Sequence, residues 1–470
     1  MPNRPTLAAV EVEPFALDTI ASLSRALEVY TPPIHLAGVH SCAAFALLLS
    51  QTHDGRMIKN PHVIVTPDHE TAELFAASLE FFDPLRAVHL LPAFDVDPYS
   101  GLYPNPRAIA SRLNWLYHAA HATCGEIFVA SVEAVMQKTL PFQVFNSFIR
   151  TIERTSELPK NFAAYLLAIG YLAVPTVEDV GTFSVRGGVI DIFSPAHSHP
   201  LRLELFGDTV ESLRFFDPST QLSLENSQST PAGATRASAV ILPAREVLYS
   251  DENRQAIARA LSQPPNEMLR SASLGQPFYG MDYLVPLFYE TPGAPLEYFS
   301  SPIDFWIFHE IETARAADEV LARLKKGFNE SSSTLFRVPV ESLYTEYEKL
   351  ELAPDSTRIH VNRAAVGQDN EAPPVELSSF SLQEFAASTQ PLVTALDQLT
   401  QYLQTKFQEW QRLGYRIFVV CPKYLHRARK RRALAANEMI RAVGAPQARV
   451  LLSEPVVQGF APTCTFRYPW

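Results

Sequence analysis

Residues 62–82 read HVIVTPDHETAELFAASLEFF. The first part, residues 62–68, is a continuous apolar run that ends in Pro-Asp, which is typical of a buried strand ending in a turn. The second part, residues 70–82, places its apolar residues at helical spacing. We therefore expect a strand that leads through a turn into a helix, the repeating unit of an α/β fold.

The same alternation continues on both sides of this unit. Downstream, the pattern predicts a strand over 87–92, a helix over 107–120 and a strand over 127–131. Upstream, it predicts a helix over 16–30, a strand over 34–38 and, over 42–49, a helix that is apolar nearly all round. Strands that alternate with helices indicate βαβ units and a parallel sheet.

The pattern changes after about residue 140. A helix over 161–169 precedes a strand-rich stretch, and residues 201–206 and 209–215 are predicted to form a hairpin around Gly207-Asp208. We expect residues 1–140 and 223–330 to build one parallel-sheet domain from two segments, with 141–222 as an inserted α+β domain. Residues 335–470 are expected to form a third small α/β domain, in which a helix over 392–413 leads into a strand over 416–420.

Composition excludes several function classes. The 470 residues include 39 Lys and Arg against 50 Asp and Glu, and this net charge of −11 argues against a general binder of nucleic acid. The four cysteines form no CxxC pair, so neither a zinc knuckle nor a disulfide framework is indicated. No apolar run is long enough for a membrane span, and we expect a cytoplasmic protein with no membrane contact. The one dense basic run, residues 423–432, either touches DNA locally or is a solvated basic helix.

Residues 38–45, GVHSCAAF, occupy the place of a phosphate-binding loop but lack most of its chemistry. Aligned with G-x-x-x-x-G-K-[ST], the segment keeps Gly38, while Ala43, Ala44 and Phe45 replace the second glycine, the lysine and the hydroxyl residue. Those three positions would supply close backbone approach, a cation for the phosphates and a magnesium ligand. We therefore expect no nucleotide hydrolysis at this loop.

The predicted strand 304–308 runs into His309-Glu310, where a helicase-type ATPase has Asp-Glu. Histidine in place of aspartate removes a hard oxygen ligand for magnesium. His309 and Glu310 could also act as a metal or acid–base pair, although a polar strand end is the interpretation we favour. The predicted site is thus an inactive nucleotide site with no catalytic residue, cofactor or metal, made of Gly38, Ala43, Ala44, Phe45, His309 and Glu310.

Three segments of the predicted insertion carry a resemblance to known proteins. They are Gly170-Tyr171, the run VGTFSVRGGVIDIF over 180–193, and RLELFGD over 202–208 continued by ESLRF over 211–215. Together they resemble the module shared by the nucleotide-excision-repair protein UvrB and the bacterial transcription-repair coupling factors. UvrB has an intact phosphate loop and a hairpin with paired tyrosines, and this chain has neither. The chain is therefore similar to the N-terminal region of the coupling factors, well over 15–325 and loosely over 335–460.

The resemblance implies an architecture and a function. The fold would be a degenerate RecA-like, P-loop-type parallel-sheet domain built from two segments, an inserted UvrA-binding α+β domain, and a third small α/β domain. The function would be a non-enzymatic module that recruits UvrA, linking stalled RNA polymerase to nucleotide excision repair. Contacts with RNA polymerase and DNA, and the translocase motor, would lie beyond residue 470. Alternatives are a UvrB-like ATP-dependent subunit that loads onto damaged DNA, and a regulatory domain that masks other parts of its parent protein.

The resemblance points to Arg186, Arg202 and Arg214 as UvrA contacts. Alternation along 201–206 puts Arg202 on the face opposite Leu201, so its guanidinium is expected to be exposed. The competing interpretation is that Arg202 only pairs with nearby glutamates. Arg214 would point to the leucine face unless a bulge turns it round.

Overall fold

The structure is a computed structural model of the chain. It describes residues 33–39, 41–50, 60–100, 102–224, 238–248, 281–330 and 338–363, with the short pieces 375–376, 412, 418–421 and 449–452. The predicted helix over 16–30, nearly all of the one over 392–413 and the basic run 423–432 lie outside the described residues.

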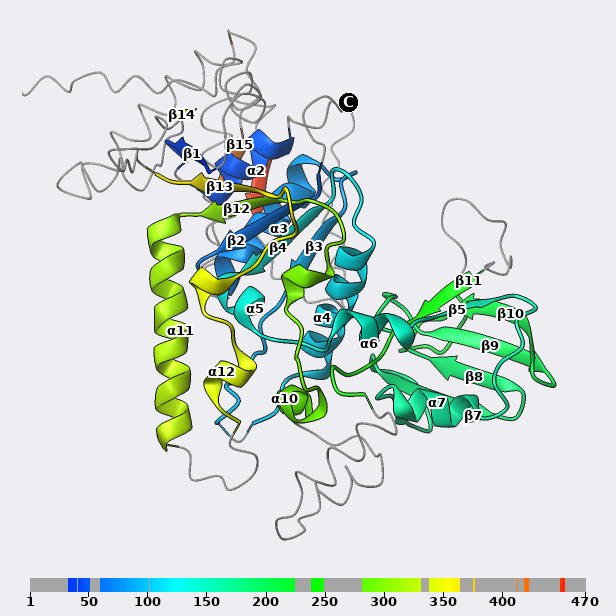
Figure 1. The fold of residues 1–470 in the computed structure, drawn as a ribbon. Coiled ribbons are helices and arrows are strands. Elements are labelled where there is room, and N and C mark those ends of the chain that lie inside the picture. Colours follow the sequence, from blue (N-terminus) through cyan, green and yellow to red (C-terminus); the bar gives the residue numbers. More distant parts are fainter. Residues whose placement is uncertain are drawn as a thin grey trace, which may run out of the picture.

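A seven-stranded parallel sheet forms the larger part of the molecule (Figure 1). Its order is β14-β1-β13-β12-β2-β4-β3. The strands are β1 (Ile34–Ala37), β2 (His62–Thr66), β3 (Val88–Leu91), β4 (Ile127–Ser131), β12 (Asp304–Phe308), β13 (Thr357–Val361) and β14 (Val375–Glu376). The α/β class with a parallel sheet, predicted from the alternation, is confirmed.

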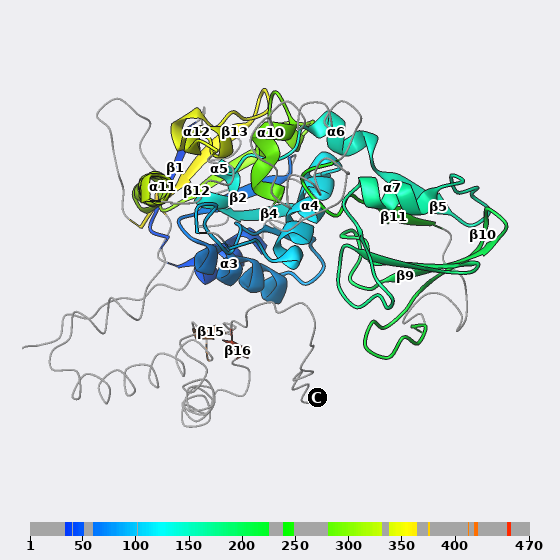
Figure 2. The same ribbon diagram turned by 90° about the horizontal axis from the view of Figure 1, so that it is seen from below.

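Helices cover both faces of this sheet, as Figure 2 shows. They are α2 (Cys42–Ser50), α3 (His69–Phe82), α4 (Pro106–Ala120), α5 (Val132–Met136) and α11 (Glu310–Glu330). Strand β2 is buried throughout, and its side chains divide between two apolar clusters. Ile64 packs with residues of α2 and α3, whereas Val63 and Val65 pack with residues of α4, α5 and α11. A parallel sheet buried on both faces accounts for the continuous apolar run at 62–66.

Strand β13 corrects the predicted start of the third domain at residue 335. It lies in the middle of the main sheet, between β12 and β1, where Ile359 stands level with Trp306 on one side and Ile34 on the other. All three side chains are buried in one cluster. Without β13, the edges of β1 and β12 would lack their hydrogen-bond partners. The first domain therefore extends to residue 361 at least, and the organisation of later residues stays a prediction.

A second lobe projects to one side of the main sheet (Figure 1). It holds a five-stranded sheet of order β10-β9-β8-β7-β6, helix α7 (Phe162–Ala168) and a two-stranded sheet of β5 (Arg150–Glu153) and β11 (Ser238–Ile241). The five strands are β6 (Leu172–Ala173), β7 (Thr182–Arg186), β8 (Val189–Ile192), β9 (Leu201–Phe206) and β10 (Thr209–Phe215). The predicted hairpin is confirmed, with Gly207 in the left-handed region (φ 65°) at its turn.

Strand β11 also moves a predicted boundary. We expected the chain to return to the first domain at residue 223, but residues 238–241 pair antiparallel with residues 150–153 inside the lobe. The return therefore follows β11. The remaining described elements are α6 (Phe142–Ser147), α10 (Val285–Phe288), α12 (Val340–Leu343), the 3-10 helices η2 (Met281–Leu284), η3 (Pro295–Tyr298) and η4 (Tyr347–Lys349), and the parallel pair β15 (Phe418–Cys421) and β16 (Arg449–Leu452).

The segment that leaves β11 fastens the lobe to the first domain. The Tyr171 hydroxyl donates to the Leu242 carbonyl at 2.7 Å, and Arg245 donates to the buried carboxylate of Asp282 at 3.2 Å. Gly170 packs closely against the same segment, because a Cβ atom added there would lie 2.5 Å from Cγ of Arg245. The lobe and the first domain thus share one packed core.

We expect Gly170→Ala to lower the free energy of unfolding by about 2–3 kcal/mol, because it combines a left-handed backbone (φ 91°) with a displaced Arg245. Gly125 is the matched control, since it has a similar φ of 87° but nothing within 4 Å of an added Cβ. Gly125→Ala should cost only the backbone strain, about 1–2 kcal/mol. Urea unfolding of both variants measures the difference, and equal losses would show that the contact with Arg245 contributes nothing.

Candidate functional site

The loop after β1 is the first candidate, and its backbone is already occupied by protein contacts. The amides of Gly38 (φ 85°) and Val39 donate to the carbonyls of Arg363 and Asn362, at 3.2 and 3.1 Å. At the start of α2, the Ser41 hydroxyl accepts from the amide of Ala44 at 3.2 Å. In a phosphate-binding loop such helix amides face the phosphates. Here a side chain of the loop caps one of them.

Phe45 fills the position where a phosphate loop would have its magnesium-binding hydroxyl. Its side chain is completely buried, and its ring centroid lies 5.4 Å from that of Trp306 and 5.5 Å from that of Phe75. Ala43, at the place of the second glycine, is buried as well. Two of the three residues that replace the nucleotide chemistry, Ala43 and Phe45, therefore serve as core, while Ala44 is partly exposed.

His309 closes the other side of the same loop. It is buried in the left-handed region (φ 55°), its ring stacks on Phe308 with centroids 4.0 Å apart, and its Nε2 lies 3.2 Å from the Val39 carbonyl. As the donor of this bond, the imidazole joins the end of β12 to the loop after β1. Glu310 turns away from it and pairs with Nδ1 of His360 at 3.0 Å. The structure therefore does not bring His309 and Glu310 together as an acid–base or metal pair.

The outer face of the lobe sheet is the second candidate, and a buried carboxylate organises it. Asp191 on β8 has a side chain only 1% exposed. Arg202 on β9 donates to both of its oxygens, at 2.7 and 2.9 Å, and Arg186 on β7 donates to Oδ2 at 2.9 Å. Two guanidinium groups on one carboxylate compensate the cost of burying its charge.

The expected exposure of Arg202 is wrong. Its side chain is 20% exposed, lies over the ring of Phe216 at 4.5 Å and is held by Asp191 rather than by either nearby glutamate. The hydrogen bonds to Asp191 raise the pKa of Arg202 further. Arg186 is different, since 56% of its side chain is exposed. Of this pair, Arg186 is the one available to a partner.

A bulge turns Arg214 onto the same face. The register of β10 against β9 shifts between Val210 and Ser212, so that Arg214 stands opposite Arg202. Its guanidinium bonds to Glu204, which also accepts from the Ser212 hydroxyl at 2.7 Å. The sequence predicted that Arg214 would join the other arginines only if the hairpin had a bulge, and the bulge is present.

Phe206 is a surface residue that the sequence reasoning missed. It ends β9 directly before the turn, and 79% of it is exposed. The sequence did contain this information, because Phe206 alternates in step with Arg202 and Glu204 along the strand and so points away from the leucine face. We call Arg186, Glu204, Phe206 and Arg214 the arginine-phenylalanine face.

Comparisons with known proteins match part of the lobe and most of the chain. A family profile described as the UvrB interaction domain matches residues 152–235, which include all four residues of the arginine-phenylalanine face. The transcription-repair-coupling factor of Myxococcus xanthus is 31% identical over 453 residues, covering 88% of this chain and 36% of that protein. The chain resembles the N-terminal region of the transcription-repair-coupling factors.

Other coupling factors match a smaller share. That of Haemophilus influenzae is 28% identical over 264 residues, which are 54% of this chain and 22% of that protein. That of Escherichia coli K12 is 25% identical over 322 residues, 66% of this chain and 26% of that protein. The chain thus spans about a third or less of the length of these coupling factors. Among the described residues, no helix has both the length and the apolar character that crossing a bilayer requires.

Proposed function

We propose that this chain acts in transcription-coupled DNA repair as a non-enzymatic module that recruits UvrA. The observation that carries the proposal is the arginine-phenylalanine face, which lies within the segment similar to the UvrB interaction domain. In this proposal UvrA is the partner of that face. Contacts with RNA polymerase and DNA belong to segments other than those described.

The chemistry of the face supports a protein partner. Arginine and aromatic residues dominate the binding energy of many interfaces, because both bury a large area and keep a directed polar or π contact. Phe206 presents a ring that is 79% exposed at the end of the β9–β10 hairpin, and Arg186 is held through Asp191 while more than half of its side chain stays in solvent. Both groups are therefore accessible to a partner, and Arg186 is already held in position by Asp191.

The absence of enzymatic activity in this module is supported by the loop after β1. Ser41 caps the helix amide, Phe45 is core, and His309 joins the loop to β12. Ala44 and His309 stand at the two positions where phosphate and magnesium binding would need a lysine and an aspartate. We expect fluorescent ATP analogues to show no saturable binding at micromolar concentration. Saturable binding that a substitution at Gly38 abolishes would contradict this part of the proposal.

Isothermal titration calorimetry of the chain with UvrA tests recruitment directly. We expect saturable binding, and we expect Phe206→Ala to weaken it about thirtyfold, since loss of a central interface aromatic costs about 2 kcal/mol or more. Leu102→Ala is the matched control: Leu102 is 61% exposed and lies in the first domain, away from the lobe sheet. Absence of binding by the unmodified chain, or equal weakening by both variants, would overturn the proposed function.

A further inference from the structure

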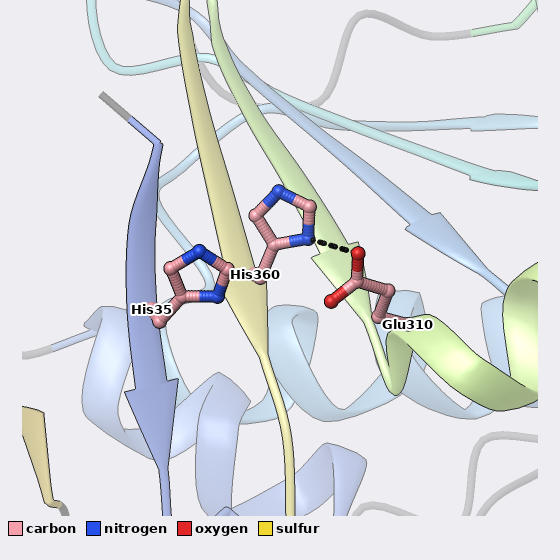
Figure 3. Close-up of side chains that lie close together, drawn as sticks. All are labelled: His35, Glu310 and His360. Atoms are coloured by element: carbon pink, nitrogen blue, oxygen red, sulfur yellow. Dashed lines mark ion pairs between the residues drawn. The ribbon is translucent and has the colours of Figure 1, made fainter. Parts of the chain in front are cut away.

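Two neighbouring strands of the main sheet and the start of a helix bring three potential metal ligands together (Figure 3). His35 lies on β1, His360 lies on β13, and Glu310 is the first residue of α11, two residues after β12 ends. None of the three belongs to the arginine-phenylalanine face, and none of their side chains makes the contacts described above for the loop after β1. The inference drawn from them is therefore independent of the proposed function.

The sheet fixes the two histidines side by side. His35 and His360 are register partners in the parallel β1–β13 pair, so their side chains leave the same face of the sheet. Their rings stack with centroids 4.7 Å apart and an angle of 16° between planes. Glu310 reaches the same place from α11 and brings Oε1 to 3.0 Å from Nδ1 of His360. One ligand atom from each residue lies within 4.8 Å of the others.

We propose that His35, Glu310 and His360 bind a divalent transition-metal cation of the zinc type. Two imidazole nitrogens and one glutamate oxygen are a ligand set that zinc uses when one coordination position is left open. Bond lengths of about 2.1 Å at tetrahedral angles place neighbouring ligand atoms about 3.4 Å apart. The Glu310–His360 pair already has nearly this spacing.

His35 is the ligand that must move. Lone pairs of imidazole nitrogens lie in the ring plane, so two stacked rings do not aim at a common point. Rotation of the His35 ring about its terminal torsion, which is broad for histidine, brings one of its nitrogens toward the Glu310–His360 pair without moving the strand. The backbone framework of three hydrogen-bonded strands therefore stays rigid while one ring turns.

The charges around the triad suit a cation. Glu310 brings the one carboxylate of the triad, and its Oε1 lies against Nδ1 of His360. Burial and, to a smaller extent, Glu310 raise the pKa of Tyr347, and Arg363 pairs with Glu312 in the same first turn of α11 at 3.8 Å. A bound cation would replace the proton that His360 shares with Glu310, and neutral imidazole is the form that coordinates.

Cobalt(II) provides a spectroscopic probe, because its d–d absorption reports coordination by protein ligands. We expect the unmodified chain to bind one equivalent of Co²⁺ and to release it to Zn²⁺. His35→Ala and His360→Asn should each weaken binding at least tenfold. His69→Ala is the matched control, since His69 faces Glu73 at 3.5 Å on the exposed side of α3 without a third ligand.

His35→Ala is the decisive variant, because it leaves the Glu310–His360 ion pair intact while removing one proposed metal ligand. It therefore distinguishes a three-ligand metal site from a simple ion pair. Far-ultraviolet circular dichroism establishes that each variant is folded. If His360→Asn fails to fold, the comparison of His35→Ala with His69→Ala still stands. Equal Co²⁺ affinity in the unmodified chain and His35→Ala, or no binding by the unmodified chain at tens of micromolar, would overturn the proposal.

Discussion

Arg112→Met will lower the free energy of unfolding by about 3–5 kcal/mol, because it leaves a buried carboxylate without its counter-charge. Arg112 lies on α4 and Glu246 follows β11, and both side chains are completely buried. The Arg112 Nε donates to Oε1 of Glu246 at 2.7 Å, and its guanidinium also donates to the Pro92 carbonyl at 3.2 Å. The pair therefore joins the first domain to the segment that returns from the lobe.

Urea unfolding measures this loss, and the double variant Arg112→Met, Glu246→Leu is its control. Removing both charges should recover most of the stability, because a buried pair and an apolar pair of similar volume differ little. Burial raises the pKa of Glu246 and Arg112 opposes that rise, so in Arg112→Met the pKa goes higher still. The penalty should then shrink as the pH falls and Glu246 takes up a proton. A loss below 1 kcal/mol, or one that does not depend on pH, would contradict this account.

Under the proposed function, Arg186→Glu combined with Arg214→Glu will weaken UvrA binding by about 2–5 kcal/mol, because both guanidinium groups become desolvated at the interface. Loss of the exposed Arg214–Glu204 pair should cost about 1 kcal/mol or less, whereas Arg186→Glu places a carboxylate beside buried Asp191 and should lower the stability of the free chain further. Calorimetry with UvrA measures the affinity, and thermal unfolding checks the fold.

Arg107→Glu combined with Arg315→Glu is the matched control for this double reversal. Both are exposed, ion-paired arginines on α4 and α11, outside the lobe sheet. Arg202 is left out, because it is only 20% exposed and holds both oxygens of buried Asp191, so reversing its charge would lower stability more than Arg186→Glu does. Unchanged UvrA affinity in a well-folded Arg186→Glu, Arg214→Glu variant would remove the arginines from the proposed site.

The local pattern predicted most of the helices and strands that the structure describes up to residue 131. Strand β2 and helix α3 lie where the run at 62–82 placed them, and the hairpin at 201–215 turns at Gly207. These predictions succeeded because apolar periodicity and turn residues act within a few positions of the chain. The substituted residues of the loop after β1 were likewise visible in the sequence, although their contacts with each other were not.

The errors concern pairings between distant segments. Nothing near Ile359 indicates that it packs between Trp306 and Ile34, because that position depends on strand order. Arg202 was expected in solvent because alternation gives the face of a side chain but not its neighbour, here Asp191 on the adjacent strand. The triad of His35, Glu310 and His360 likewise could not be predicted from local sequence, because these residues meet only through the strand order β1-β13-β12.

The order of strands in the main sheet has a consequence for synthesis on the ribosome. Both neighbours of β1, the strands β13 and β14, are encoded roughly 320 residues after it. At about 5–20 residues per second, β1 and the apolar helix α2 wait roughly 15–60 s for them to emerge. During that time β2, β4 and β3 already have each other as partners, whereas β1 does not. The amino-terminal strand of this chain is therefore among the last parts of its sheet to be secured, and a nascent chain halted before residue 357 leaves it open.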